Sequence, residues 1–189
     1  MAALLKTPKT RGDFQLDNAA AALMASACLK TRLPVSTTQL SQGLQKVHLD
    51  GRFQVLPGPV TWILDVAHNE QAVRAITENL RSFRCSGRLH AVLGILKGRD
   101  PKAIAEPLAE QVHAWYLGQS TDPRSLPVSD LRTGMAGIET HADLNCCGTI
   151  TEALRDAEGA ARPGDCILAF GSFTTVEAAL RWRHSRPSS

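Results

Sequence analysis

The fold is indicated most clearly by residues 61–69, which read Thr-Trp-Ile-Leu-Asp-Val-Ala-His-Asn (TWILDVAHN). A short apolar run leads directly into polar residues, and Val73, Ile76, Leu80 and Phe83 then recur at spacings of three and four. The run is typical of a strand covered on both faces, and the recurrence predicts a helix with one apolar face. This stretch therefore predicts a strand followed by a crossover helix.

Further apolar runs lie on both sides of this unit and are separated by longer amphipathic segments. The alternation indicates an α/β fold with a largely parallel sheet of about six strands flanked by helices. The predicted strands are residues 52–56, 61–66, 89–93, 114–117, 137–141 and 166–170.

Several helix starts are marked by side chains that accept a hydrogen bond from an otherwise unpaired backbone N–H group. Asp100 precedes Pro101 at a first helical position, ahead of Ile104 and Leu108. Thr149 with Glu152, and Thr174 with Glu177, have the spacing of capping boxes. We expect one helix to begin at each of these three places.

The first 48 residues have a different pattern. Asp17-Asn18 is predicted to cap an alanine-rich helix that extends to Leu29, and Ser36 with Gln39 predicts a second helix. We therefore predict a helical segment at residues 1–48 and an α/β domain at residues 49–189.

The composition is that of an ordinary globular protein and not of a nucleic-acid-binding one. Apolar residues make up 43% of the chain and charged residues 21%, as in an ordinary globular domain. The formal net charge of +3 comes from scattered residues, and only 5% of residues are aromatic, so we expect no nucleic-acid partner. This charge suits a small anionic ligand better.

The five cysteines form an odd set without CxxC spacing, and no signal peptide precedes them. Cys146-Cys147 has no Cys or His neighbour at ligand spacing, so we favour free thiols over a metal site. The most apolar run, residues 19–29, is shorter than the roughly 20 residues of a membrane helix. We expect a cytoplasmic protein without a membrane segment.

Ligands of open α/β sheets bind at the carboxyl ends of the strands. Asp65, at the end of one strand, has a carboxylate suited to two ribose hydroxyls, and His68 beside a helix start is suited to phosphate. The alternative is that Asp65 and Asn69 only cap the following helix.

Two further residues are candidates on the same reasoning. Arg52 begins a predicted strand and either contacts a nucleotide or is a solvated charge. Ser172 follows Phe170-Gly171 at a helix start, where its hydroxyl either contacts a carboxylate or phosphate or serves only as a cap. The chain lacks the motifs of a phosphate loop, a dinucleotide-binding loop, a zinc protease or a serine hydrolase.

These residues together resemble folylpolyglutamate synthase and the bifunctional dihydrofolate synthase of bacteria, which belong to the Mur ligase superfamily. The matching segments follow the family's order: FQLDNAA (14–20), GRFQ (51–54), LDVAHN (64–69), VLG (92–94) and ILAFGSFTTV (167–176). The sequence departs from the family at Glu70, where proline is usual, and at Gly98-Arg99-Asp100, where Asp-Lys-Asp is common.

The resemblance implies a Rossmann-like carboxy-terminal domain of an ATP- and magnesium-dependent ligase. Such enzymes phosphorylate the carboxylate of dihydropteroate or a folate, and the amino group of L-glutamate then attacks the acyl phosphate. The resemblance also implies roles for individual residues. Asn18 would lie beside the adenine, and Arg52, Asp65 and Asn69 would contact the nucleotide. His68 would be catalytic, and Ser172 would contact the substrate.

The family's phosphate loop and magnesium ligands belong to an amino-terminal ATPase domain, and residues 1–48 resemble the tail of that domain. We therefore expect a fragment that is inactive alone and needs the ATPase domain as its partner. The alternative is a non-catalytic module that binds a nucleotide or glutamate and has lost its partner domain. An unrelated receiver or methyltransferase domain is disfavoured, because the acidic cluster or glycine-rich loop is missing.

Overall fold

The computed structural model describes residues 14–47, 49–83 and 85–185. The chain forms two compact units, Met1–Leu49 and Asp50–Ser189. The first thirteen residues of the predicted helical segment, and residue 48 at its end, lie outside the described ranges. None of the helices in these ranges is long and apolar enough to span a lipid bilayer.

The first unit contains two helices, α1 (Phe14–Cys28) and α2 (Thr37–Lys46). The capping box of α2 is confirmed, because Gln39 N donates to Ser36 Oγ over 3.2 Å and Ser36 N donates to Gln39 Oε1 over 2.8 Å. The predicted start of α1 was wrong. Asp17 lies in the first turn and not at a cap, because the helix begins upstream at Phe14 and includes Gln15 and Leu16, which are good helix formers.

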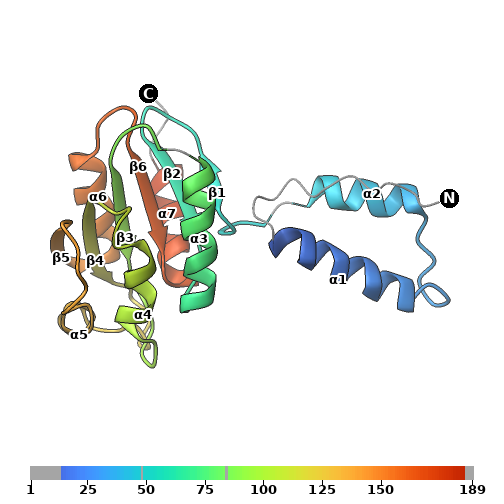
Figure 1. Ribbon diagram of the computed structural model, residues 1–189, viewed down its shortest axis with the longest axis horizontal. Helices are drawn as coiled ribbons and strands as arrows, with labels where there is room; N and C mark the ends of the chain where they lie inside the picture. Colours follow the sequence, from blue (N-terminus) through green and yellow to red (C-terminus); the bar gives the residue numbers. More distant parts are fainter. Residues whose placement is uncertain (1–13, 48, 84, 186–189) are drawn as a thin grey trace. The chain divides into compact units, whose positions relative to one another are not determined.

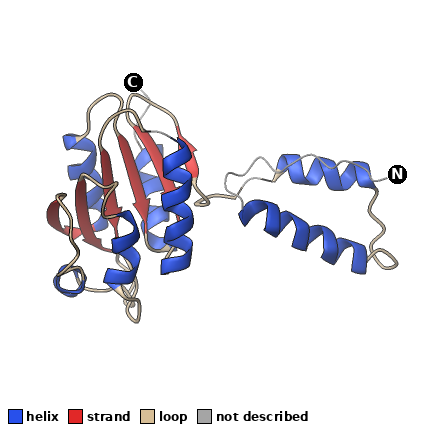
Figure 2. Cartoon of the chain, viewed as in Figure 1, coloured by secondary structure: helices blue, strands red, loops and turns tan. Residues whose placement is uncertain are grey.

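The second unit is built on a six-stranded sheet, shown in red in Figure 2. The strands lie in the order β1-β2-β6-β3-β4-β5 (Figure 1), with β1 antiparallel to β2 and every other neighbouring pair parallel. The predicted α/β class with a mostly parallel sheet is therefore confirmed. The strand bounds are β1 (Gln54–Leu56), β2 (Thr61–Asp65), β3 (Leu89–Leu93), β4 (Ala114–Gln119), β5 (Asp143–Thr149) and β6 (Cys166–Phe170).

Helices cover both faces of this sheet (Figure 1). One face carries α3 (Glu70–Phe83), α4 (Pro101–Ala105), the 3-10 turn η1 (Glu106–Leu108) and α5 (Val128–Gly134). The other carries α6 (Ile150–Ala160) and α7 (Phe173–His184). Each face of the sheet has its own apolar core. Successive side chains of β2 point to opposite faces, so Ile63 packs in the core beneath α3, α4 and α5, while Trp62 and Leu64 pack in the core beneath α6 and α7. Each such fully buried side chain stabilises the fold by roughly 1.5–3 kcal/mol.

One predicted strand was misplaced. Residues 137–141 do not form a strand, and the fifth strand is β5, a few residues further on. Cys147 alone is buried in β5, because the strand lies at the edge of the sheet. An edge strand has no need of the continuous apolar run on which the prediction depended.

Two of the three predicted helix starts in this unit are confirmed. Asp100 caps α4 by accepting from Lys102 N over 2.9 Å, and Thr149 forms a capping box with Glu152. The third was wrong, because α7 begins two residues earlier than the Thr174 cap requires. Ser172 is the cap, in extended backbone, and its Oγ accepts from Thr175 N over 3.1 Å.

Candidate functional site

A cavity of about 240 Å³ lies where the segments that follow β2, β3, β4 and β6 come together. These strands run parallel, so their carboxyl ends lie at one edge of the sheet, which is the usual ligand-binding edge of open α/β folds. The lining residues are His68, Leu96, Arg99, Asp122, Arg124, Gly171, Ser172, Phe173 and Thr174.

His68 is half-buried, and its ring orientation is set by the backbone. Its Nδ1 atom lies 2.8 Å from Val66 O. A carbonyl oxygen only accepts hydrogen bonds, so Nδ1 must donate. The neutral ring then has an unprotonated Nε2 atom, which is suited to accept a proton or a hydrogen bond.

Ser172 is only 3% exposed and lies in a network of hydroxyl groups. Its Oγ is 2.8 Å from Thr175 Oγ1 and 3.0 Å from Thr174 Oγ1. Thr175 donates its hydrogen to Gly94 O and Thr174 donates to Ser120 Oγ. The Ser172 hydrogen is therefore directed to one of these two threonines, which fixes the hydroxyl.

Gly171 allows this network to form beside the cavity. Its φ of +106° is accessible to glycine but rarely to other residues. A Cβ atom here would lie 2.7 Å from Gly94 O and 2.8 Å from a methyl carbon of Leu93. The close passage of β6 past β3 therefore requires glycine.

The charged side chains of the cavity carry an excess of positive charge. Arg124 forms an ion pair with Asp122 in which the Nη2 and Oδ2 atoms are 2.8 Å apart. Hydrogen bonds from the Arg124 side chain and backbone hold the pKa of Asp122 below its usual value. Arg99 also lines the cavity, so its lining includes two guanidinium groups and one carboxylate, and this excess of positive charge is suited to an anion.

Asp65 is 6% exposed, and backbone groups hold both of its carboxylate oxygens. Phe53 N donates to Oδ2 and Ala67 N donates to Oδ1, each over 2.8 Å. Phe53 has a φ of +43°, so the carboxylate stabilises an unusual turn before β1. Burial raises the pKa of Asp65 above its usual value, although both N–H groups and Arg52 act to lower it.

The remaining predicted residues lie in separate surroundings. Asn69 caps α3, since its Oδ1 accepts from Ala72 N over 2.9 Å. Arg52 is exposed beside Asp65, and Asn18 lies in α1 of the other unit, on the wall of a groove between α1 and α2. The structure thus brings His68 and Ser172 together in one cavity, whose described lining includes none of the other four.

Arg99 and Arg124 are two lining residues, both cationic, that sequence reasoning missed. Both follow parallel strands at their carboxyl ends, as His68 and Ser172 do, so the same rule would have found them. Arg124 is held by a backbone bridge between Leu96 and the buried Ser125. No spacing in the sequence signals that bridge.

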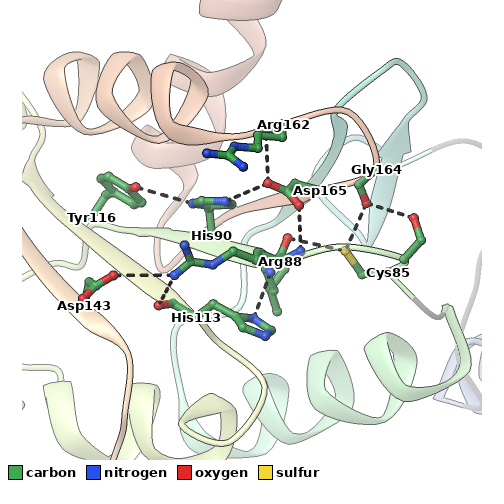
Figure 3. Close-up of polar contacts among 11 residues, drawn as sticks. Cys85, Arg88, His90, His113, Tyr116, Asp143, Arg162, Gly164 and Asp165 are labelled. Atoms are coloured by element: carbon green, nitrogen blue, oxygen red, sulfur yellow. Dashed lines mark hydrogen bonds and ion pairs between the residues drawn. The ribbon is translucent and has the colours of Figure 1, made fainter.

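A second polar cluster is centred on His90 and Asp165, at the ends of the strands opposite to the cavity (Figure 3). Its buried groups bond to one another and to the backbone, as expected of a structural network. Within the described ranges, no group of three His, Cys, Asp or Glu residues could hold a metal ion.

Comparison with known families gives a match to the Mur ligase, glutamate ligase domain, over residues 51–173. Among curated proteins, the chain is similar to the dihydrofolate synthase/folylpolyglutamate synthase of Buchnera aphidicola subsp. Acyrthosiphon pisum. The two are 30% identical over 177 residues, which are 94% of this chain and 41% of that protein.

The chain is also similar to solved structures of the same enzymes. Escherichia coli FolC in complex with DHPP and ADP has a TM-score of 0.78 and 28% identity, over 98% of this chain and 41% of that one. A bifunctional folylpolyglutamate synthase/dihydrofolate synthase with Mn, AMPPNP and L-glutamate bound has a TM-score of 0.79 and 31% identity, over 97% of this chain and 42% of that one. The chain spans about two fifths of the length of these relatives.

Proposed function

Because the chain belongs to the family of Mur ligase glutamate ligase domains, we propose that it forms the glutamate-binding side of an ATP-dependent ligase. The proposed reaction adds L-glutamate to dihydropteroate, to folates, or to both, through an acyl phosphate. The observation that carries the proposal is that His68 and Ser172 line one cavity together with Arg99 and Arg124.

The chemistry of this reaction suits the cavity. A carboxylate that becomes an acyl phosphate gains negative charge, and guanidinium groups placed in advance stabilise that charge. We assign Arg99 and Arg124 to this role. We assign to His68 Nε2 the hydrogen bond from the amino group of glutamate, because the hydrogen bond to Val66 O leaves that atom free to accept.

Ser172 and the start of α7 are proposed to bind a carboxylate or phosphate oxygen through backbone N–H groups. Asp65 and Asn69 would contribute to nucleotide binding mainly by holding the turns on which Arg52 and His68 lie. Asn18 is proposed to contact adenine from the other unit. These assignments follow the family resemblance and the contacts of each residue.

ATP and magnesium are proposed cosubstrate and cofactor of the complete enzyme. The relatives in the two solved structures were bound to ADP, or to Mn with AMPPNP. We assign no metal ligand to the described residues of this chain, and we propose that the magnesium ligands lie in a partner ATPase domain. The cytoplasmic location is part of the same proposal.

The first unit offers a surface for that partner. Its α2 helix has no buried residue, and large apolar side chains such as Met24 (70% exposed) and Leu33 (61% exposed) contact water. The groove between α1 and α2 is lined mainly by apolar residues. Apolar surface of this extent is typical of an interaction site, and we propose that the ATPase domain covers it.

The direct test is to join residues 1–189 to the amino-terminal part of the Escherichia coli relative and to assay glutamate addition to dihydropteroate. We expect ATP-dependent amide formation by the joined protein and none by the chain alone. His68→Ala should then lower kcat by roughly 10²–10⁴-fold if its ring takes part in proton transfer.

The matched control is His141→Ala, because His141 is exposed and comes before β5, outside the cavity. Equal rates for the two histidine variants would remove His68 from the reaction. A joined protein that folds and binds ATP without forming the amide would contradict the proposal. It would favour a module that binds a nucleotide without catalysis.

A further inference from the structure

Phe173 is an exposed aromatic residue in a unit that leaves few of its large apolar side chains exposed. It is 65% exposed. Within residues 50–83 and 85–185, the other exposed large apolar side chain is Leu144, at 44%. Leu144 lies in the edge strand β5, whereas Phe173 is the first residue of α7.

The position of Phe173 beside the cavity suggests what covers it. It lines the cavity with His68, Arg99 and Arg124, so an aromatic surface and groups suited to an anion border the same space. Leu96 adds a second apolar side chain. This pairing fits a ligand in which an anionic group is attached directly to a flat apolar group.

Dihydropteroate has this arrangement, because its reacting carboxylate is bonded directly to a benzene ring. When the carboxylate lies against the arginines, the ring must lie within a few ångströms of it. Ring contacts of the edge-to-face or offset-stacked kind stabilise such a complex. A benzoyl ring would therefore lie against the side chain of Phe173.

We propose that Phe173 is a binding residue for the benzoyl ring of dihydropteroate, an inference that rests on the proposed function and adds a determinant of specificity. Folates with a glutamate tail react through a carboxylate at the end of a flexible aliphatic side chain. Their methylene groups, and not an aromatic ring, would face Phe173. The residue therefore favours the first glutamate addition over later ones.

A binding experiment on the 189-residue chain tests the ring contact directly. The probes are 4-(methylamino)benzoate, an aryl carboxylate, and glutarate, an aliphatic dicarboxylate, each followed by saturation-transfer NMR. We expect Phe173→Ala to weaken binding of the aryl carboxylate roughly tenfold and to leave glutarate binding unchanged. Leu144→Ala is the matched control and should bind both probes as the unchanged chain does.

Equal binding of the aryl carboxylate by the unchanged chain and Phe173→Ala would overturn the inference. So would the absence of any saturation transfer to this probe at about 10 mM, a concentration that would nearly saturate a site with a Kd of about 1 mM. A tenfold loss confined to Phe173→Ala and to the aryl probe would support it.

The joined protein separates failure of this inference from failure of the proposed function. If the joined protein is active, Phe173→Ala should raise the KM for dihydropteroate more than the KM for a folate that already carries glutamate. Equal changes would overturn the inference and leave the proposed function standing. An inactive joined protein, with aryl binding that still depends on Phe173, would overturn the ligase reaction and leave the ring-binding site.

Discussion

The Nε2 atom of His90 lies 3.3 Å from Oδ2 of Asp165, and the two side chains are 2% and 9% exposed (Figure 3). Asp165 also accepts from Arg88 N over 2.7 Å and from Arg162 N over 2.9 Å. The His90 Nδ1 atom is 3.4 Å from the Tyr116 hydroxyl. A neutral His90 can donate to Asp165 and accept from Tyr116. The three side chains then link β3, β4 and the segment that precedes β6.

Acid is expected to destabilise the second unit through His90. Burial lowers the pKa of His90, although its bond to Asp165 acts to raise it. Below about pH 6.5 the unfolded chain therefore binds a proton that the folded protein does not, and the free energy of unfolding falls with pH. We expect a Tm, followed by circular dichroism, that decreases from about pH 7.5 to about pH 5.5.

Two variants separate His90 from other titrating groups. His90→Gln keeps a donor toward Asp165 but does not titrate, so its Tm should change less with pH than that of the unchanged chain. His141→Gln removes an exposed imidazole outside the cluster and is the matched control. Identical slopes for all three proteins would show that His90 does not contribute to the acid sensitivity.

Asp165 and Asp143 provide a comparison between a buried and an exposed carboxylate near Arg88. The pKa of Asp165 lies below its usual value: burial raises it, but the N–H groups of Arg162 and Arg88 and the His90 ring outweigh that effect. Its contribution to stability is therefore present above about pH 3.9 and is lost as the pH falls through the lower folded pKa.

We expect Asp165→Asn to lower the free energy of unfolding by about 1–3 kcal/mol, since its NH₂ group would face backbone or imidazole donors. Asp143→Asn breaks a 3.5 Å ion pair between exposed side chains and should cost about 1 kcal/mol or less. Urea denaturation measures both values. A larger loss for Asp143→Asn would mean that Asp165 does not hold the strands together.

The buried parts of the fold were predictable from sequence, because burial on both faces leaves a direct signal. Strands β2 and β6 are continuous apolar runs, and Thr149 caps α6 with a side chain three residues from its partner. Both signals are local in the sequence. Strand β5 gives no such signal, because it is exposed at the edge of the sheet.

The site was less predictable, because its contacts are long-range. Asp65 is bonded to Phe53 N, twelve residues earlier, and no pattern of spacing indicates that partner. Arg124 lines the cavity because a distant bridge holds its loop. The strand-end rule did select two residues that line the cavity, His68 and Ser172, since it depends on topology and not on the partner of each side chain.

Asp65→Ala is expected to destabilise the protein even without nucleotide. The substitution removes the acceptor of two buried N–H groups, which should cost about 1–3 kcal/mol of unfolding free energy. In the joined protein, we expect kcat/KM for ATP to fall by an amount that corresponds to a similar free energy, about 1–3 kcal/mol. Asp130→Ala, an exposed carboxylate in α5, is the control. If both variants unfold at the same urea concentration, the Asp65 carboxylate does not stabilise the turn at Phe53.

Gly171→Ala is expected to damage the cavity as well as the fold. Its φ of +106° strains any residue with a side chain, and the added Cβ would meet Gly94 O at 2.7 Å. Ser172 would have to move with it. We therefore expect a loss of unfolding free energy greater than the roughly 1–2 kcal/mol that a positive φ alone costs.

Gly137→Ala isolates the cost of the backbone conformation. Gly137 also has a positive φ, +82°, but a Cβ atom there meets nothing within 4 Å. The difference between the two variants in urea denaturation therefore measures the steric conflict between β6 and β3, and only Gly171→Ala should also lower activity in the joined protein. Equal losses would mean that the backbone relaxes around Gly171, in which case the close passage of the two strands does not determine where the Ser172 hydroxyl lies.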